Sequence, residues 1–100
     1  MSTKFESAFQ SVSNHNERAV FTAVAVAAPG FPGLGADREL LADVACVALN
    51  RLAPRYIRHE VDFSFYQTEE ERGTAQRLLT DAVAFAFAYV QARTASKAAA

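Results

Sequence analysis

The chain has 100 residues, of which 51% are hydrophobic and 21% charged. This is enough for one globular domain, and the balance excludes a wholly disordered chain. Ten basic and eleven acidic residues leave a net charge of −1. Proteins that coat nucleic-acid polymers rely on a basic excess, so we expect no such binding. The single cysteine, Cys46, excludes an internal disulfide and fits a reducing compartment.

Apolar runs are too short for a membrane span, which needs roughly 18 consecutive apolar residues. The longest candidates are Ala19–Ala28 and Ala82–Val90. No basic segment precedes an early apolar stretch, so no secretory leader is indicated. We therefore expect a cytoplasmic protein that does not bind membranes.

A helical period occupies the chain from about Thr3 to Ala28, where apolar residues recur at steps of three and four. Thr3 and Asn14 each stand three residues before a glutamate, the pattern of a capping box. The helix therefore begins at one of these positions, and a start at Asn14 leaves a short separate turn before it. The run Pro29–Gly35 holds five of the seven Pro and Gly residues and predicts a loop between helices.

Two further helices are predicted after this loop. Asp37 is a favourable N-cap for the first of them, and Pro54 disfavours helix at Ala53, so the helix is expected to end near Leu52. The second opens with the capping box Thr68-Glu69-Glu70-Glu71, and its apolar face continues to Val90.

An alternating apolar and polar pattern in residues 57–66 predicts a strand with one buried face. A single strand is not stable alone, and the chain offers no obvious second one. The segment therefore either pairs with the same strand of another copy, which predicts a homodimer, or lies extended across the helices. The expected fold class is mainly α, with three principal helices and one short strand or extended segment (57–66). Residues 95–100 have low complexity and predict a disordered tail.

No convincing catalytic or metal-binding set is present in the sequence. His15, His59 and Cys46 are far apart, and no nucleophile with a neighbouring base can be identified. We therefore predict that the protein is not an enzyme, with no catalytic residue, no metal and no cofactor.

One concentrated feature lies where the second helix stops, and it holds three arginines and a histidine within nine residues. Arginine binds phosphate through its bidentate fork, and its planar guanidinium stacks on bases. The predicted ligand-binding residues are Asn50, Arg51, Arg55, Tyr56, Arg58 and His59. The alternative interpretation is structural, because arginines at a helix C-terminus interact with its dipole and can pair with Asp62 or Glu69–Glu71.

Residues 43–56 resemble the motif of the late competence development ComFB family, a helix that ends in Ala-Leu-Asn-x-Leu-Pro-Pro-x-Tyr. The upstream spacing of Asn14, Glu17 and Val20 is also similar to that family. Ala53 replaces the first proline of the motif. Some members carry a cysteine pair associated with zinc before the second helix, where this chain has none, so zinc is not carried over.

The resemblance implies a single domain at residues 1–94 in a small, helical, homodimeric protein linked to competence or pilus-related behaviour. Some members are reported as receptors for cyclic dinucleotides, notably cyclic di-GMP. We therefore expect a non-catalytic cyclic di-GMP receptor or adaptor that signals through protein contacts, with a downstream partner that the sequence does not identify. The alternative is a nucleotide-independent protein–protein adaptor.

Overall fold

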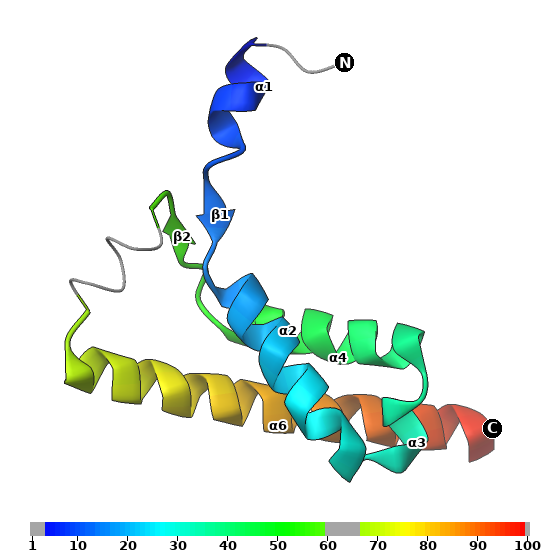
Figure 1. Cartoon of the computed structure of the whole chain (residues 1–100). Helices are drawn as coiled ribbons and strands as arrows, with labels where there is room; N and C mark the ends of the chain where they lie inside the picture. The colour runs from blue at the N-terminus through cyan, green and yellow to red at the C-terminus, as the bar shows by residue number, and fades with distance from the viewer. Residues whose placement is uncertain (1–3, 60–66, 100) are drawn as a thin grey trace.

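The computed structural model describes residues 4–59 and 67–99. It is mainly α-helical, as predicted, and its three long helices are α2 (Asn16–Ala27), α4 (Arg38–Arg51) and α6 (Glu69–Ala99). The shorter elements, in chain order, are α1 (Lys4–Phe9), β1 (Ser13–Asn14), a 3-10 turn (Ala28–Gly30), α3 (Pro32–Gly35) and β2 (Tyr56–Ile57). In Figure 1, α6 forms a long base on which α2 and α4 lie, while α1 projects away from them.

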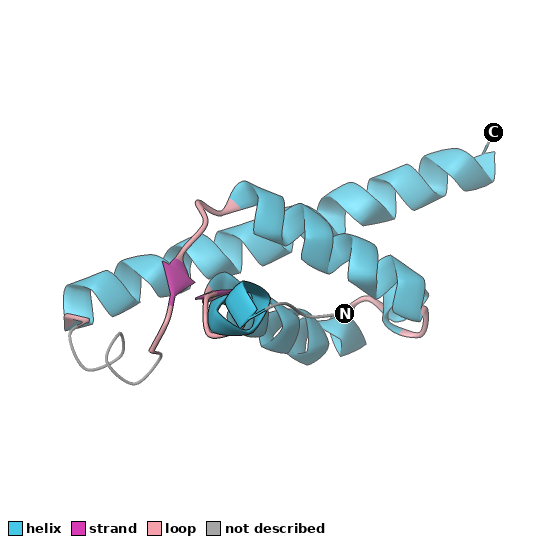
Figure 2. Cartoon of the chain, turned by 90° about the horizontal axis from the view of Figure 1, so that it is seen from above, coloured by secondary structure: helices cyan, strands magenta, loops and turns pink. Residues whose placement is uncertain are grey.

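The core lies where α2, α4 and α6 meet (Figures 1 and 2). Its buried residues are valines, alanines, one leucine and one phenylalanine, and the many small side chains allow the helix axes to approach closely. Phe87 of α6 is fully buried and stacks on Phe31, with 4.3 Å between the ring centroids and 10° between the ring planes. This pair joins the connection between α2 and α4 to the base helix.

The predicted start and stop of α4 and the predicted start of α6 are confirmed. The Asp37 carboxylate caps α4 by accepting hydrogen bonds from the backbone amides of Glu39 and Leu40, at 3.0 and 3.2 Å. The helix ends at Arg51, just before the predicted boundary. At the start of α6, the Thr68 hydroxyl accepts from the Glu71 amide at 3.1 Å. α6 is helical along its whole length, including the aromatic residues Phe85, Phe87 and Tyr89 near its middle.

The first helical segment is divided, and the principal helix begins close to Asn14, as one of the two interpretations predicts. The capping box predicted there is wrong, because the N-cap residue is His15 and its side chain makes no capping bond. Asn14 instead accepts a hydrogen bond from the Asn16 amide. The run Pro29–Gly35 does interrupt the helix, but it forms a 3-10 turn and α3 rather than an irregular loop.

The expectation that the chain lacks a second strand is wrong. β1 and β2 pair antiparallel within one chain, with Ser13 opposite Ile57 and Asn14 opposite Tyr56. Two residues between a helix and a turn carry too little pattern to be recognised as a strand from sequence. Residues 60–66 of the predicted strand lie outside the described residues. The homodimer stays a prediction, although its argument from an unpaired strand no longer holds.

The end of the chain also differs from its prediction. α6 continues to Ala99, whereas low complexity predicts a disordered tail at residues 95–100. Alanine has the highest helix propensity, so this alanine-rich segment extends a helix already nucleated. Within the described ranges, none of the helices combines the length and apolar character needed to cross a membrane.

Gly35 is expected to be required for the turn into α4. A Cβ built there would lie 2.5 Å from the Ala28 carbonyl oxygen, whereas at Gly33 it would meet nothing within 4 Å. We expect Gly35→Ala to lower the free energy of unfolding by about 1–3 kcal/mol, because backbone must shift to relieve the overlap. Gly33→Ala is the matched control and should be neutral or slightly stabilising. Urea unfolding measures both, and equal stabilities for the two variants would contradict the close approach.

Candidate ligand-binding groove

The first two residues of the predicted cluster, Asn50 and Arg51, lie at the end of α4, and their side chains contact different parts of the structure. Asn50 donates from Nδ2 to the Cys46 carbonyl oxygen at 3.0 Å, so its side chain bonds its own helix. Arg51 lies over the Phe85 ring of α6, with its Cζ 3.9 Å from the ring centroid. The guanidinium of Arg51 is therefore engaged in a cation–π contact at the α4–α6 junction.

Three more predicted residues lie in or beside β2. The Tyr56 side chain is 69% exposed and lines none of the principal cavities. Arg58 donates from Nε to the Ser11 hydroxyl at 3.3 Å, on the segment that precedes β1. His59 is exposed at the edge of the described residues.

Arg55 lies in a third environment, different from those of Arg51 and Arg58. Its backbone is fixed on both sides, because its amide donates to Asn14 Oδ1 at 3.1 Å and its carbonyl accepts from the His15 amide at 2.7 Å. The residue lines a cavity between α2 and α6. The three arginines of the predicted cluster thus contact three different parts of the molecule and do not line a common cavity.

Two adjoining cavities, of about 600 and 650 Å³, form what we call the α2–α6 groove. They share His15 and Ala19 on one wall and Gln76 and Leu79 on the other, so they follow one seam between the two helices. The polar and charged lining residues are His15, Asn16, Arg18, Thr22, Arg55, Gln67, Arg72, Gln76 and Thr80. Each cavity has the size of typical small-molecule sites, which span roughly 300–1,000 Å³.

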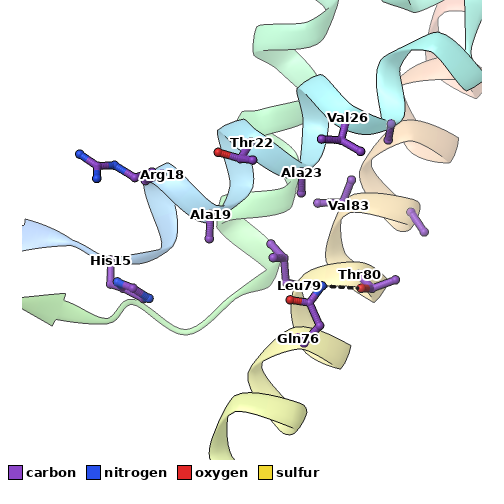
Figure 3. Close-up of a pocket in the computed structure, with 12 residues that line it drawn as sticks. His15, Arg18, Ala19, Thr22, Ala23, Val26, Gln76, Leu79, Thr80 and Val83 are labelled. Carbon is purple, nitrogen blue, oxygen red and sulfur yellow. Dashed lines mark hydrogen bonds between the residues drawn. The ribbon is translucent and has the colours of Figure 1, made fainter. Parts of the chain in front are cut away.

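Figure 3 shows how one part of the groove is built. His15 and Ala19 come from the N-terminal end of α2, and Gln76, Leu79 and Thr80 come from the facing turns of α6. Gln76 donates from Nε2 to the Thr80 hydroxyl at 3.4 Å, along the exposed side of α6. The Arg18 side chain extends outward from the rim, away from the α6 wall. The groove thus has apolar walls with polar groups at its mouth.

The charge of the groove departs from that of the chain. Arg18, Arg55 and Arg72 line it, and the described lining residues include no aspartate or glutamate. The cavity between α2 and α4, of about 720 Å³, has instead one acidic and one basic lining residue, Glu17 and Arg38. Among the cavities of the described residues, the α2–α6 groove therefore has the greatest excess of arginines over carboxylates in its lining.

Sequence reasoning included one groove arginine, Arg55, among its candidates and missed Arg18 and Arg72. Arg18 lies one turn after His15 and Gln76 one turn after Arg72, so helical spacing could have grouped each pair on one face. Nothing in the sequence shows that these two faces oppose each other, because that depends on how α2 crosses α6.

Across residues 4–59 and 67–99, no three His, Cys, Asp or Glu side chains gather to hold a metal ion. Cys46 is an exposed free thiol on α4.

Comparison with known proteins bears on both the fold and the motifs. No curated protein and no solved structure matches the chain. Residues 13–94 match the family model of the late competence development protein ComFB. The matched range begins at β1 and ends in α6, so it contains all three long helices up to the last turns of α6. Because the match covers most of the chain, including the motif at residues 43–56, the chain belongs to the ComFB family.

Proposed function

We propose that this ComFB-family protein is a receptor for a cyclic dinucleotide, with cyclic di-GMP as the first candidate, and that the α2–α6 groove is its binding site. The observation that carries the proposal is the set of three arginines around a groove in which the described lining residues include no carboxylate. A cyclic dinucleotide presents two phosphates and two bases, so it needs cationic groups and flat or apolar contact surfaces together.

The chemistry of the lining fits these two needs. Guanidinium groups bind phosphate oxygens through paired, charge-assisted hydrogen bonds. The amide of Gln76 and the hydroxyl of Thr80 can donate to and accept from the edge of a base. Ala19, Leu79 and the ring of His15 provide surface against which the faces of bases pack. Arg55 keeps its predicted role in this site, while Arg51 and Arg58 lie outside it.

The receptor role requires no chemical step. A bound ligand changes a partner's affinity only when it favours one conformation or assembly of the protein over another. The groove joins α6 to the segment around β1 and β2, so a ligand that bridges its two walls stabilises their present arrangement. The proposal therefore includes the prediction from the sequence that the protein is not an enzyme.

Isothermal titration calorimetry of the whole chain tests the proposal. We expect cyclic di-GMP to bind with a Kd near or below about 1 μM, which corresponds to about −8 kcal/mol. Cyclic di-AMP and the linear dinucleotide of guanosine, titrated under the same conditions, separate base and ring-closure preferences. A thermal melt with each ligand at about 100 times the expected Kd is the second measurement. If none of the three ligands gives binding heat or raises the melting temperature, the receptor proposal is wrong.

The second candidate function is a nucleotide-independent adaptor in competence or pilus-related processes. It is favoured by the cavity between α2 and α4, beside which the Phe21 ring is 52% exposed. Apolar surface of this kind suits protein contacts. Sedimentation of the same samples with and without cyclic di-GMP measures the predicted homodimer. Assembly that is identical in both conditions, together with no nucleotide binding, would select the adaptor.

A further inference from the structure

One side chain connects the two segments that meet at the end of the α2–α6 groove. Asn14 Oδ1 accepts hydrogen bonds from the backbone amides of Asn16 and Arg55, both at 3.1 Å. Asn16 donates from Nδ2 to the Ala53 carbonyl at 2.9 Å. We call this set of contacts between residues 13–16 and residues 53–57, together with the β1–β2 pairing, the Asn14 junction.

The junction holds two groove residues by their backbones. The His15 amide donates to the Arg55 carbonyl at 2.7 Å, and the Arg55 amide donates to Asn14. Both residues line the same cavity of about 600 Å³. Arg55 follows the turn at Pro54 and belongs to no long helix, so these bonds, rather than helix packing, fix its backbone beside α2.

We propose that Asn14 is a positioning residue that sets the ligand affinity of the α2–α6 groove by holding Arg55 beside His15. This inference rests on the proposed receptor function. When only part of the population has the binding-competent arrangement, the measured Kd rises in inverse proportion to that part. We call the junction closed when these hydrogen bonds are formed. By linkage, a ligand that binds more tightly to the closed junction also makes it more stable.

The test compares three variants of the whole chain by calorimetry with cyclic di-GMP. Asn14→Ala removes the shared acceptor and is expected to raise Kd about tenfold, which corresponds to a closed fraction near one tenth. Asn14→Asp keeps an oxygen acceptor for both amides and is expected to stay within about threefold of the parent. Titrations in 0.3 M salt limit the effect of its added charge. Gln91→Ala removes a carboxamide from the exposed side of α6 and is the matched control with unchanged affinity.

Amide hydrogen exchange adds a readout at the junction itself. The Arg55 amide is expected to exchange faster in Asn14→Ala than in the parent or Asn14→Asp, and more slowly in the parent once cyclic di-GMP is bound. If Asn14→Ala fails to fold by circular dichroism, Asn16→Ala replaces it. That variant removes the bond from Asn16 to Ala53 and should give a smaller loss of affinity. Because Asn16 also lines the groove, the loss supports positioning only when the Arg55 amide exchanges faster in the same variant, and unchanged exchange contradicts it.

The outcomes separate this inference from the function on which it rests. A parent protein that binds no cyclic dinucleotide overturns the receptor and the coupling with it. A parent that binds, with Asn14→Ala at equal affinity, overturns the positioning role and leaves the receptor intact. Loss of affinity in Asn14→Asp while the Arg55 amide stays protected also overturns positioning, because Asn14 would then contact the ligand directly.

Discussion

Phe87→Ala is expected to lower the free energy of unfolding by about 3–5 kcal/mol, the typical cost of removing a large buried aromatic side chain. Phe87 is fully buried in the core between the three long helices, and its ring stacks on Phe31 at 4.3 Å. Most of the other buried side chains in the core are alanines and valines, which have little rotamer freedom with which to fill the cavity. Domains of this size have total stabilities of about 5–15 kcal/mol, so the variant should approach the limit of folding.

Phe85→Ala is the matched control on the same helix. Its ring is 39% exposed and contacts Arg51, so its loss should cost about 1 kcal/mol, mainly through the cation–π pair and partial burial. Urea unfolding followed by circular dichroism measures both variants. Equal destabilisation by the two changes would contradict the packing of α6 against α2 and α4.

The double variant Arg55→Ala/Arg72→Ala is expected to weaken cyclic di-GMP binding about 100-fold or more. Hydrogen bonds to charged groups contribute about 1.5–3 kcal/mol each, and the two arginines line the same cavity from opposite walls. Both side chains are exposed, so the melting temperature should change little. Calorimetry measures the affinity, and a thermal melt without ligand checks the fold.

The double variant Arg51→Ala/Arg58→Ala removes the same number of guanidinium groups from the predicted cluster but not from the α2–α6 groove. The two double variants therefore separate the groove from the contiguous segment as the site. Arg93→Ala, on the exposed end of α6, controls for the loss of one positive charge. Greater loss of binding in Arg51→Ala/Arg58→Ala than in Arg55→Ala/Arg72→Ala would move the site to the end of α4.

Much of the fold could be predicted because the relevant rules act over four or fewer residues. Asp37 and Thr68 cap their helices as predicted, and Pro54 follows closely after the end of α4. The strand pairing could not be predicted, because Ser13 and Ile57 are 44 positions apart and β1 is only two residues long. The last turns of α6 differed from their prediction because low complexity in an alanine-rich segment is compatible with helix.

The candidate site was likewise predicted only in part from the sequence. The clustering of Arg51, Arg55 and Arg58 in sequence is real, but a helix end followed by a turn and a strand directs successive side chains to different neighbours. Arg72 is 17 positions after Arg55 and faces the same cavity. Proximity in sequence was therefore a poor guide to proximity at the site once the chain left a regular helix.

By itself, the sequence determined the mainly helical fold class, the boundaries of α4 and the start of α6, and membership of the ComFB family through the motif at residues 43–56. These features depend on local hydrogen bonds, periodicity and a short motif. Only the tertiary structure decided which arginines share a cavity and which strand pairs with residues 56–57. The physical reason is that the first depends on how α2 crosses α6 and the second on how α2 lies against α4. Both arrangements are set by the packing of side chains far apart in the chain.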